Sequence, residues 1–80
     1  MNITIKFFAL GRELVGQSEM QLQLPEKTSV AGLIDLLKEQ YPRFAQLNSY
    51  LTAVNMEYAS IDTELKDGDE VAIIPPVSGG

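Results

Sequence analysis

Two segments near the start of the chain alternate between apolar and polar residues. In the stretch NITIKFF, residues 2–8, the apolar residues on one face are Ile3, Ile5 and Phe7. Phe8 falls on the opposite, more polar face with Thr4 and Lys6. The stretch SEMQLQL, residues 18–24, alternates again. Because a period of two residues is typical of half-buried strands, we predict two strands, most simply a hairpin, joined by a loop or a single helical turn at residues 9–16.

The next segment has the period of a helix. In TSVAGLIDLLKEQYP, residues 28–42, apolar residues recur at i, i+3, i+4, i+7 and i+11, namely Val30, Leu33, Ile34, Leu37 and Tyr41. This single stripe predicts an amphipathic helix. Thr28 or Ser29 supplies the N-cap, and Pro42 ends the helix. Gly32 inside it costs roughly 0.5–1 kcal/mol relative to Ala, and close packing against a sheet is one reason to expect a glycine there.

The second half of the chain predicts shorter elements. RFAQLNSY, residues 43–50, is typical of a turn or short helix, and LTAVN, residues 51–55, of a third strand. A short fourth strand is expected near Tyr58. Asp67-Gly68 supplies the positive φ of a tight turn, and EVAIIP, residues 70–75, predicts the last strand.

These elements predict an α+β fold, a β-grasp, with a mixed sheet of four to five strands and one main helix on one face. An apolar strand is usually central, so the last strand is expected beside the first in the middle of the sheet. One helix covers only one face. By strand parity, Phe8 and Ile74 point to the other face, which must be wet or covered by a partner.

Composition narrows the possible functions. Eighty residues predict one domain, residues 1–80, with little room for a deep cleft. The net charge of −5 disfavours nucleic acid and anionic membranes. The absence of Cys and His excludes disulfides, thiolate metal sites and Cys–His or Ser–His nucleophiles. With neither a signal peptide nor a long apolar run in the sequence, we predict a cytoplasmic protein that binds no metal or cofactor of its own.

A cluster of carboxylates precedes the last strand, comprising Asp62, Glu64, Asp67, Asp69 and Glu70. Its spacing does not fit a calcium loop. A solvated turn is the preferred interpretation, with steering of a basic partner as the alternative. Arg12 and Glu13 are interpreted as a surface pair.

The chain ends in PPVSGG, residues 75–80, which differs in character from the body. Residues 71–80 contain no charged side chain. Two prolines fix φ and project the tail, and six extended residues reach roughly 19 Å at about 3.1 Å each. Such a thin, neutral segment can enter a narrow channel without desolvating side-chain charges. We therefore predict a flexible tail whose reactive group is the carboxylate of Gly80, activated by another enzyme. The tail residues are Pro75, Pro76, Val77, Ser78, Gly79 and Gly80.

Three segments, FFALGRELVG, Asn55 and LKDGDEVAIIPPVSGG, together resemble the small subunit of molybdopterin synthase, and the resemblance covers the whole chain. It implies a ubiquitin-like β-grasp. It further implies that an E1-like enzyme uses ATP and Mg²⁺ to adenylate the Gly80 carboxylate, and that sulfur transfer then gives a thiocarboxylate. Residues 75–80 would insert into the large subunit, where sulfur passes to cyclic pyranopterin monophosphate. The family works as a heterotetramer of two small and two large subunits, and Phe8 and Ile74 would lie on the docking face.

Three alternatives stay open on the sequence. A sulfur carrier of thiamine biosynthesis also ends in Gly-Gly, although PPVSGG and FFALGRE argue against it. A ubiquitin-like modifier would be joined through Gly80 to lysines of other proteins. A passive β-grasp interaction module would have no use for the tail.

Overall fold

A five-stranded mixed sheet runs through residues 1–75, the part of the chain that the computed structural model describes. The elements in chain order are β1 (Asn2–Phe7), α1 (Ala9–Val15), β2 (Glu19–Gln23), α2 (Val30–Gln40), the 3₁₀-helix η1 (Pro42–Gln46), β3 (Leu51–Val54), β4 (Glu57–Tyr58) and β5 (Glu70–Ile74). The predicted strands and main helix are confirmed.

The strand order is β2-β1-β5-β3-β4. The first and last strands are parallel neighbours at the centre, and the two other pairs flanking them, β1 with β2 and β5 with β3, are antiparallel. This confirms the expectation that the apolar last strand lies beside the first. The predicted hairpin is also present as the antiparallel pair of β1 and β2.

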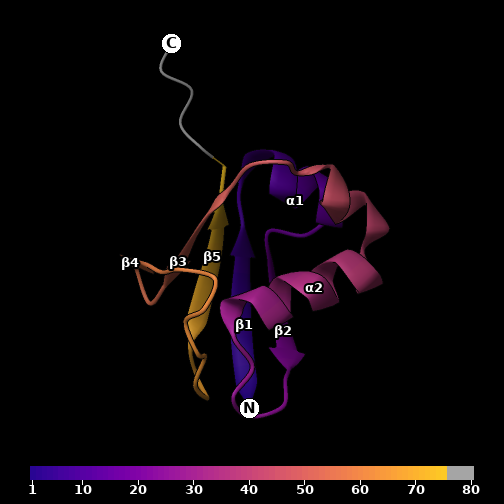
Figure 1. Cartoon of the computed structure of the whole chain (residues 1–80). Coiled ribbons are helices and arrows are strands. Elements are labelled where there is room, and N and C mark those ends of the chain that lie inside the picture. Colours follow the sequence, from indigo (N-terminus) through magenta and orange to yellow (C-terminus); the bar gives the residue numbers. More distant parts are fainter. Residues whose placement is uncertain (76–80) are drawn as a thin grey trace.

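The core lies between the sheet and α2, which crosses one face of it (Figure 1). Its centre consists of fully buried side chains from β1, α2, η1 and β5: Ile3, Ile5, Phe7, Val30, Leu33, Leu37, Phe44, Val71 and Ile73. The alternating residues of the strands and the helical stripe of α2 thus meet in one apolar layer. Burial of this layer is the main stabilising contribution to the fold.

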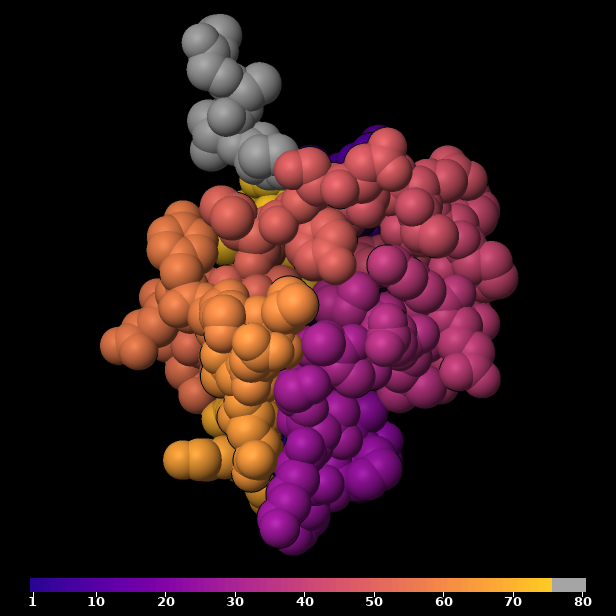
Figure 2. All heavy atoms as spheres, in the orientation of Figure 1, coloured from indigo at the N-terminus to yellow at the C-terminus, as the bar shows by residue number. Residues whose placement is uncertain are grey.

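The loop between β4 and β5 closes the N-terminal end of α2 (Figure 2). The amides of Val30 and Ala31 donate to the carbonyls of Thr63 and Ile61, each at 2.9 Å. The Ser29 side chain caps the amide of Gly32 at 3.2 Å. The first amides of a helix have no partner within the helix, so the loop and the cap together satisfy them.

Two expectations about local structure were wrong. Residues 9–15 form a seven-residue helix, longer than a loop or single turn. Burial of Leu14 and Val15 stabilises it, and Gly16 ends it with φ +85°. Gly32 does not make room for the sheet, because a Cβ there would meet the Cγ2 of Thr28, at 3.0 Å.

Candidate functional site

The base of the predicted tail is the end of β5. Ile74 pairs with Leu51 of β3, and Pro75, half-buried, follows it. β5 has a neighbour on each side: β1 pairs with it as far as Ile73, and β3 pairs with it as far as Ile74. The other predicted tail residues, Pro76, Val77, Ser78, Gly79 and Gly80, lie outside the described residues.

Beside this base, the face of the sheet opposite α2 carries an apolar patch bordered by charged side chains. Register places Ala53, Tyr58, Ala72 and Ile74 on it, and Phe8 follows β1 on the same face. These side chains and those of Lys6, Met56 and Glu70 line a hollow of about 400 Å³. We call these eight residues the open face. The shared face of Phe8 and Ile74 is thereby confirmed, while their docking role stays a prediction.

Three exposed residues in or beside the open face were not predicted from the sequence. Met56 is 95% exposed and Tyr58 is 76% exposed, although both side chains are large and mostly apolar. Residues 56–65 show no period in the sequence, so parity could not assign them a face. Leu51 is also exposed and lies opposite Ile74. Its exposure could not be predicted because β3 carries apolar residues on both faces.

Met56 belongs to a tight turn. Asn55 and Met56 connect β3 to β4, with φ +52° and +69°. A two-residue hairpin of type I′ requires positive φ at both positions, and the second is usually glycine. Methionine at this position is strained.

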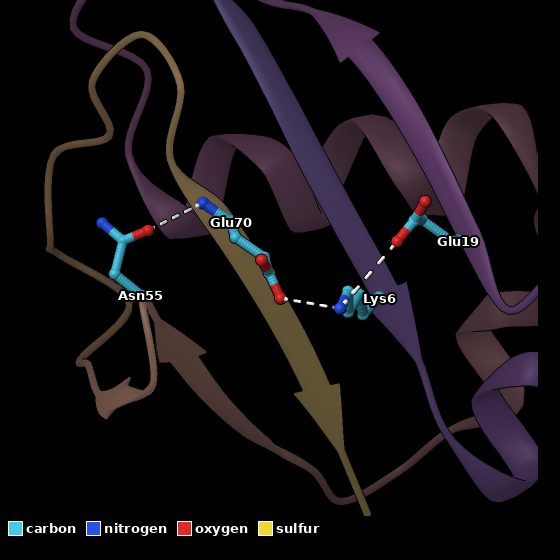
Figure 3. A network of polar contacts seen from close by, with 4 residues as sticks. All are labelled: Lys6, Glu19, Asn55 and Glu70. Carbon is cyan, nitrogen blue, oxygen red and sulfur yellow. Dashed lines mark hydrogen bonds and ion pairs between the residues drawn. The ribbon is translucent and has the colours of Figure 1, made fainter.

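A row of polar contacts crosses the sheet beside the hollow (Figure 3). Lys6 Nζ lies 3.2 Å from a carboxylate oxygen of Glu70 and 3.9 Å from one of Glu19. Asn55 holds the backbone of Glu70 in place through two hydrogen bonds. The backbone amide of Asn55 donates to the Glu70 carbonyl at 2.8 Å, and the side-chain oxygen of Asn55 accepts from the backbone amide of Glu70 at 3.0 Å. The Asn55 side chain also donates to Asp69 at 2.9 Å. The residue singled out by family resemblance thus organises the start of β5.

The acidic cluster proves to be partly structural. Asp67 accepts from the amide of Asn2 at 2.6 Å, and Asp69 accepts from that of Lys66 at 2.8 Å. Gly68 has φ +86°, as the predicted turn requires. Asp62 and Glu64 are exposed, as are Arg12 and Glu13. Within residues 1–75, no group of three or more carboxylates has the arrangement to hold a metal ion.

The arrangement is that of a binding surface. The open face offers an apolar hollow with charges at its edge, next to the strand end that carries the tail. Over the same residues 1–75, no helix is long and apolar enough to cross a membrane.

Comparison with known proteins identifies the family. A model described as ThiS family matches residues 5–80. The chain belongs to the ThiS family. A family member from Dictyostelium discoideum, named molybdopterin synthase sulfur carrier subunit, is 42% identical over 95% of this chain and 93% of its own. The resemblance inferred from the sequence is confirmed.

Solved structures confirm the ubiquitin-like β-grasp. A putative molybdopterin converting factor subunit 1 from Pyrococcus furiosus is 36% identical, with TM-score 0.88 over 96% of this chain and 99% of its own. SAMP1 from Haloferax volcanii is 25% identical, with TM-score 0.88 over the whole of both chains. A complex of subunits 1 and 2 of the molybdopterin-converting factor from Helicobacter pylori contains a chain that is 25% identical, with TM-score 0.72 over the whole of both chains.

Proposed function

We propose that this ThiS-family chain is the sulfur carrier subunit of a molybdopterin synthase. The observation that carries the proposal is the 42% identity, over nearly the full length of both chains, to a relative of that name. The absence of Cys and His from the sequence fits a chain whose chemistry is supplied by partner enzymes.

The reactive group in this proposal is the carboxylate of Gly80. A carboxylate is a poor electrophile, so an E1-like partner first adenylates it with ATP and Mg²⁺, and pyrophosphate leaves. A nucleophile at the oxidation level of sulfide (HS⁻) then attacks the acyl carbon, a C–S bond replaces the C–O bond to the adenylate, and AMP departs with one former carboxylate oxygen. The sulfur of the resulting thiocarboxylate replaces an oxygen substituent on a carbon of cyclic pyranopterin monophosphate, and hydrolysis of the acyl–sulfur bond returns Gly80 as a carboxylate. The chain presents the group and binds no cofactor itself.

The large subunit of the synthase is the proposed partner of the open face. Phe8 is 47% exposed beside the tail base, and exposed apolar patches of this kind are commonly interfaces. The complex of two subunits known for the Helicobacter pylori relative supports this partner. Contact at Phe8 and Ile74 would place residues 75–80 at the entrance of the partner's site, in a heterotetramer of two small and two large subunits.

Deletion of Gly79 and Gly80 tests the chemistry. Synthase reconstituted with the large subunit from the same organism and the activating enzyme should convert cyclic pyranopterin monophosphate only with the full chain. The intact mass of the full chain should show one oxygen replaced by sulfur, mapped to the last peptide. As a control, the shortened chain should keep its urea midpoint. Normal product formation by the shortened chain would exclude the proposal.

Substitution of Phe8 by Asp tests the docking surface. A charge buried in an apolar contact is costly, so affinity for the large subunit should fall by at least about tenfold. Ile61→Asp is the matched control, because Ile61 is 57% exposed and lines a different hollow, next to α2. Equal binding by both variants would place the interface elsewhere.

A modifier function is the second candidate. It is favoured by the similarity to SAMP1, which a second structure of the Haloferax volcanii protein names small archaeal modifier protein 1. It needs the same activated carboxylate. Isopeptide links between Gly80 and lysines of other proteins, found by mass spectrometry of native lysate, would support it.

A further inference from the structure

Met56 combines backbone strain with full exposure. Its φ is +69° at a turn position that glycine occupies without steric cost, and its side chain is 95% exposed. An exposed methionine there stabilises neither the turn nor the core. Strained residues persist where another requirement keeps them. The side chain lines the hollow of the open face, which indicates that the requirement is a contact.

The second observation is the charge beside this hollow. We call Glu19, Lys6 and Glu70 the charged row. Lys6 and Glu19 are paired directly across β1 and β2, and Glu70 lies on β5. One ammonium is shared by two carboxylates, so the row carries one excess negative charge. All three side chains are between 41% and 55% exposed, so a partner can reach them.

The row also has a fixed place relative to the tail. Glu70 begins β5 and Ile74 ends it, which puts them about 13 Å apart along the strand. Asn55 holds the backbone of Glu70 through two hydrogen bonds. Apolar contact is non-directional, whereas charge pairs fix the register of an interface. The row therefore lies where it can set the orientation of a docked protein.

We propose that the protein docked on the open face inserts an apolar side chain beside Met56 and places a basic side chain on the Glu19–Glu70 carboxylates. A partner carboxylate aimed at Lys6 would lie next to both Glu19 and Glu70 and be repelled. The net charge of −5 gives the same preference at longer range. This inference rests on the proposed function, because the probe is the large synthase subunit from the same organism.

Met56→Gly and Met56→Leu test the apolar contact. Glycine adopts positive φ without strain, so the urea midpoint should stay equal or rise. Loss of the apolar side chain should lower the affinity for the large subunit by about tenfold. Leucine keeps an apolar side chain and should retain most of the affinity. A structural role would move stability and affinity together. Unchanged affinity in Met56→Gly would overturn this half of the proposal.

Association kinetics at several salt concentrations test the charged row. Glu70→Gln should slow association by about two- to fivefold and flatten its salt dependence, whereas Glu39→Gln on α2 should do neither. Lys6→Met should bind equally or faster, with a steeper salt dependence, compared with Lys38→Met. If Glu70→Gln behaves as Glu39→Gln does, or if Lys6→Met slows association, the assignment of a basic partner group is wrong.

Phe8→Asp separates the two levels of inference. If it weakens binding while the Met56 and Glu70 variants do not, the docking surface stands and the assigned contacts fail. If it also binds normally, the docking surface itself is wrong.

Discussion

At the scale of single residues, Asn55 combines a turn conformation with several hydrogen bonds. It adopts φ +52°, begins the turn between β3 and β4, and bonds through its side chain to both Asp69 and Glu70. Asparagine is among the few residues that adopt positive φ readily. Its amide can also donate and accept at once. No other side chain meets both requirements as well.

Asn55→Ala should therefore destabilise the protein by about 1–3 kcal/mol, since two side-chain hydrogen bonds are lost and positive φ is retained. Asn55→Gly loses the same hydrogen bonds, but glycine adopts positive φ without steric cost, so this variant should be less destabilised than Asn55→Ala by about 1 kcal/mol. Urea unfolding measures both. Asn48→Ala, in an exposed loop, is the control. Equal losses for alanine and glycine would show that φ contributes nothing.

Tyr50 is the residue whose titration should affect stability. Burial raises the pKa of its phenol above the ordinary value near 10, and the Asp35 carboxylate adds to the rise. The folded protein thus keeps a proton that the unfolded chain loses. This contribution is complete below about pH 10 and is lost as pH rises through the folded pKa.

Tyr50→Phe should remove this part of the pH dependence. The difference in unfolding free energy between the parent and Tyr50→Phe should be constant below about pH 10 and change above it in favour of phenylalanine. Asp35→Asn should reduce the slope without abolishing it. A constant difference over the whole range would contradict the burial of the phenol.

At the scale of elements, α2 was predictable because period, cap and stop agree. Its stripe is buried, Ser29 caps it, and it ends at Gln40, before Pro42. The helix α1 was not predictable in the same way. It is short, contains Gly11 and ends at Gly16, and its stability comes from tertiary burial. The 56–65 segment carries no period, so its contribution to the open face depended on the turn at Asn55 and on β4.

Gly32 offers a test within α2. Gly32→Ala should gain about 0.5–1 kcal/mol of helix propensity, but its Cβ would lie 3.0 Å from the Cγ2 of Thr28. Thr28→Ser removes that methyl and keeps the hydroxyl that donates to the Pro25 carbonyl at 2.7 Å. We expect Gly32→Ala to stabilise more in the Thr28→Ser background. A double-mutant cycle by urea unfolding measures the coupling, and additive effects would contradict the steric explanation.

At the scale of the whole molecule, the place of the last strand could be inferred from the sequence, and the residues of the open face only in part. An apolar last strand and a single main helix were sufficient to place β5 beside β1. The alternation of side chains along the strands then placed Phe8 and Ile74 on the face of the sheet opposite α2. Parity cannot reveal charge pairing across strands, so the contacts of Lys6 with Glu19 and Glu70 required the register. The proposal that the end of the chain is reactive rests on composition and family resemblance.

The position of β5 also has a mechanical consequence. It is bonded to β1 along one edge and to β3 along the other. A force applied through Pro75 along the strand would shear both ladders at once instead of opening one pair at a time. A pull at this end would thus meet the resistance of both ladders, and single-molecule stretching from the C-terminal side should show a high rupture force in one step.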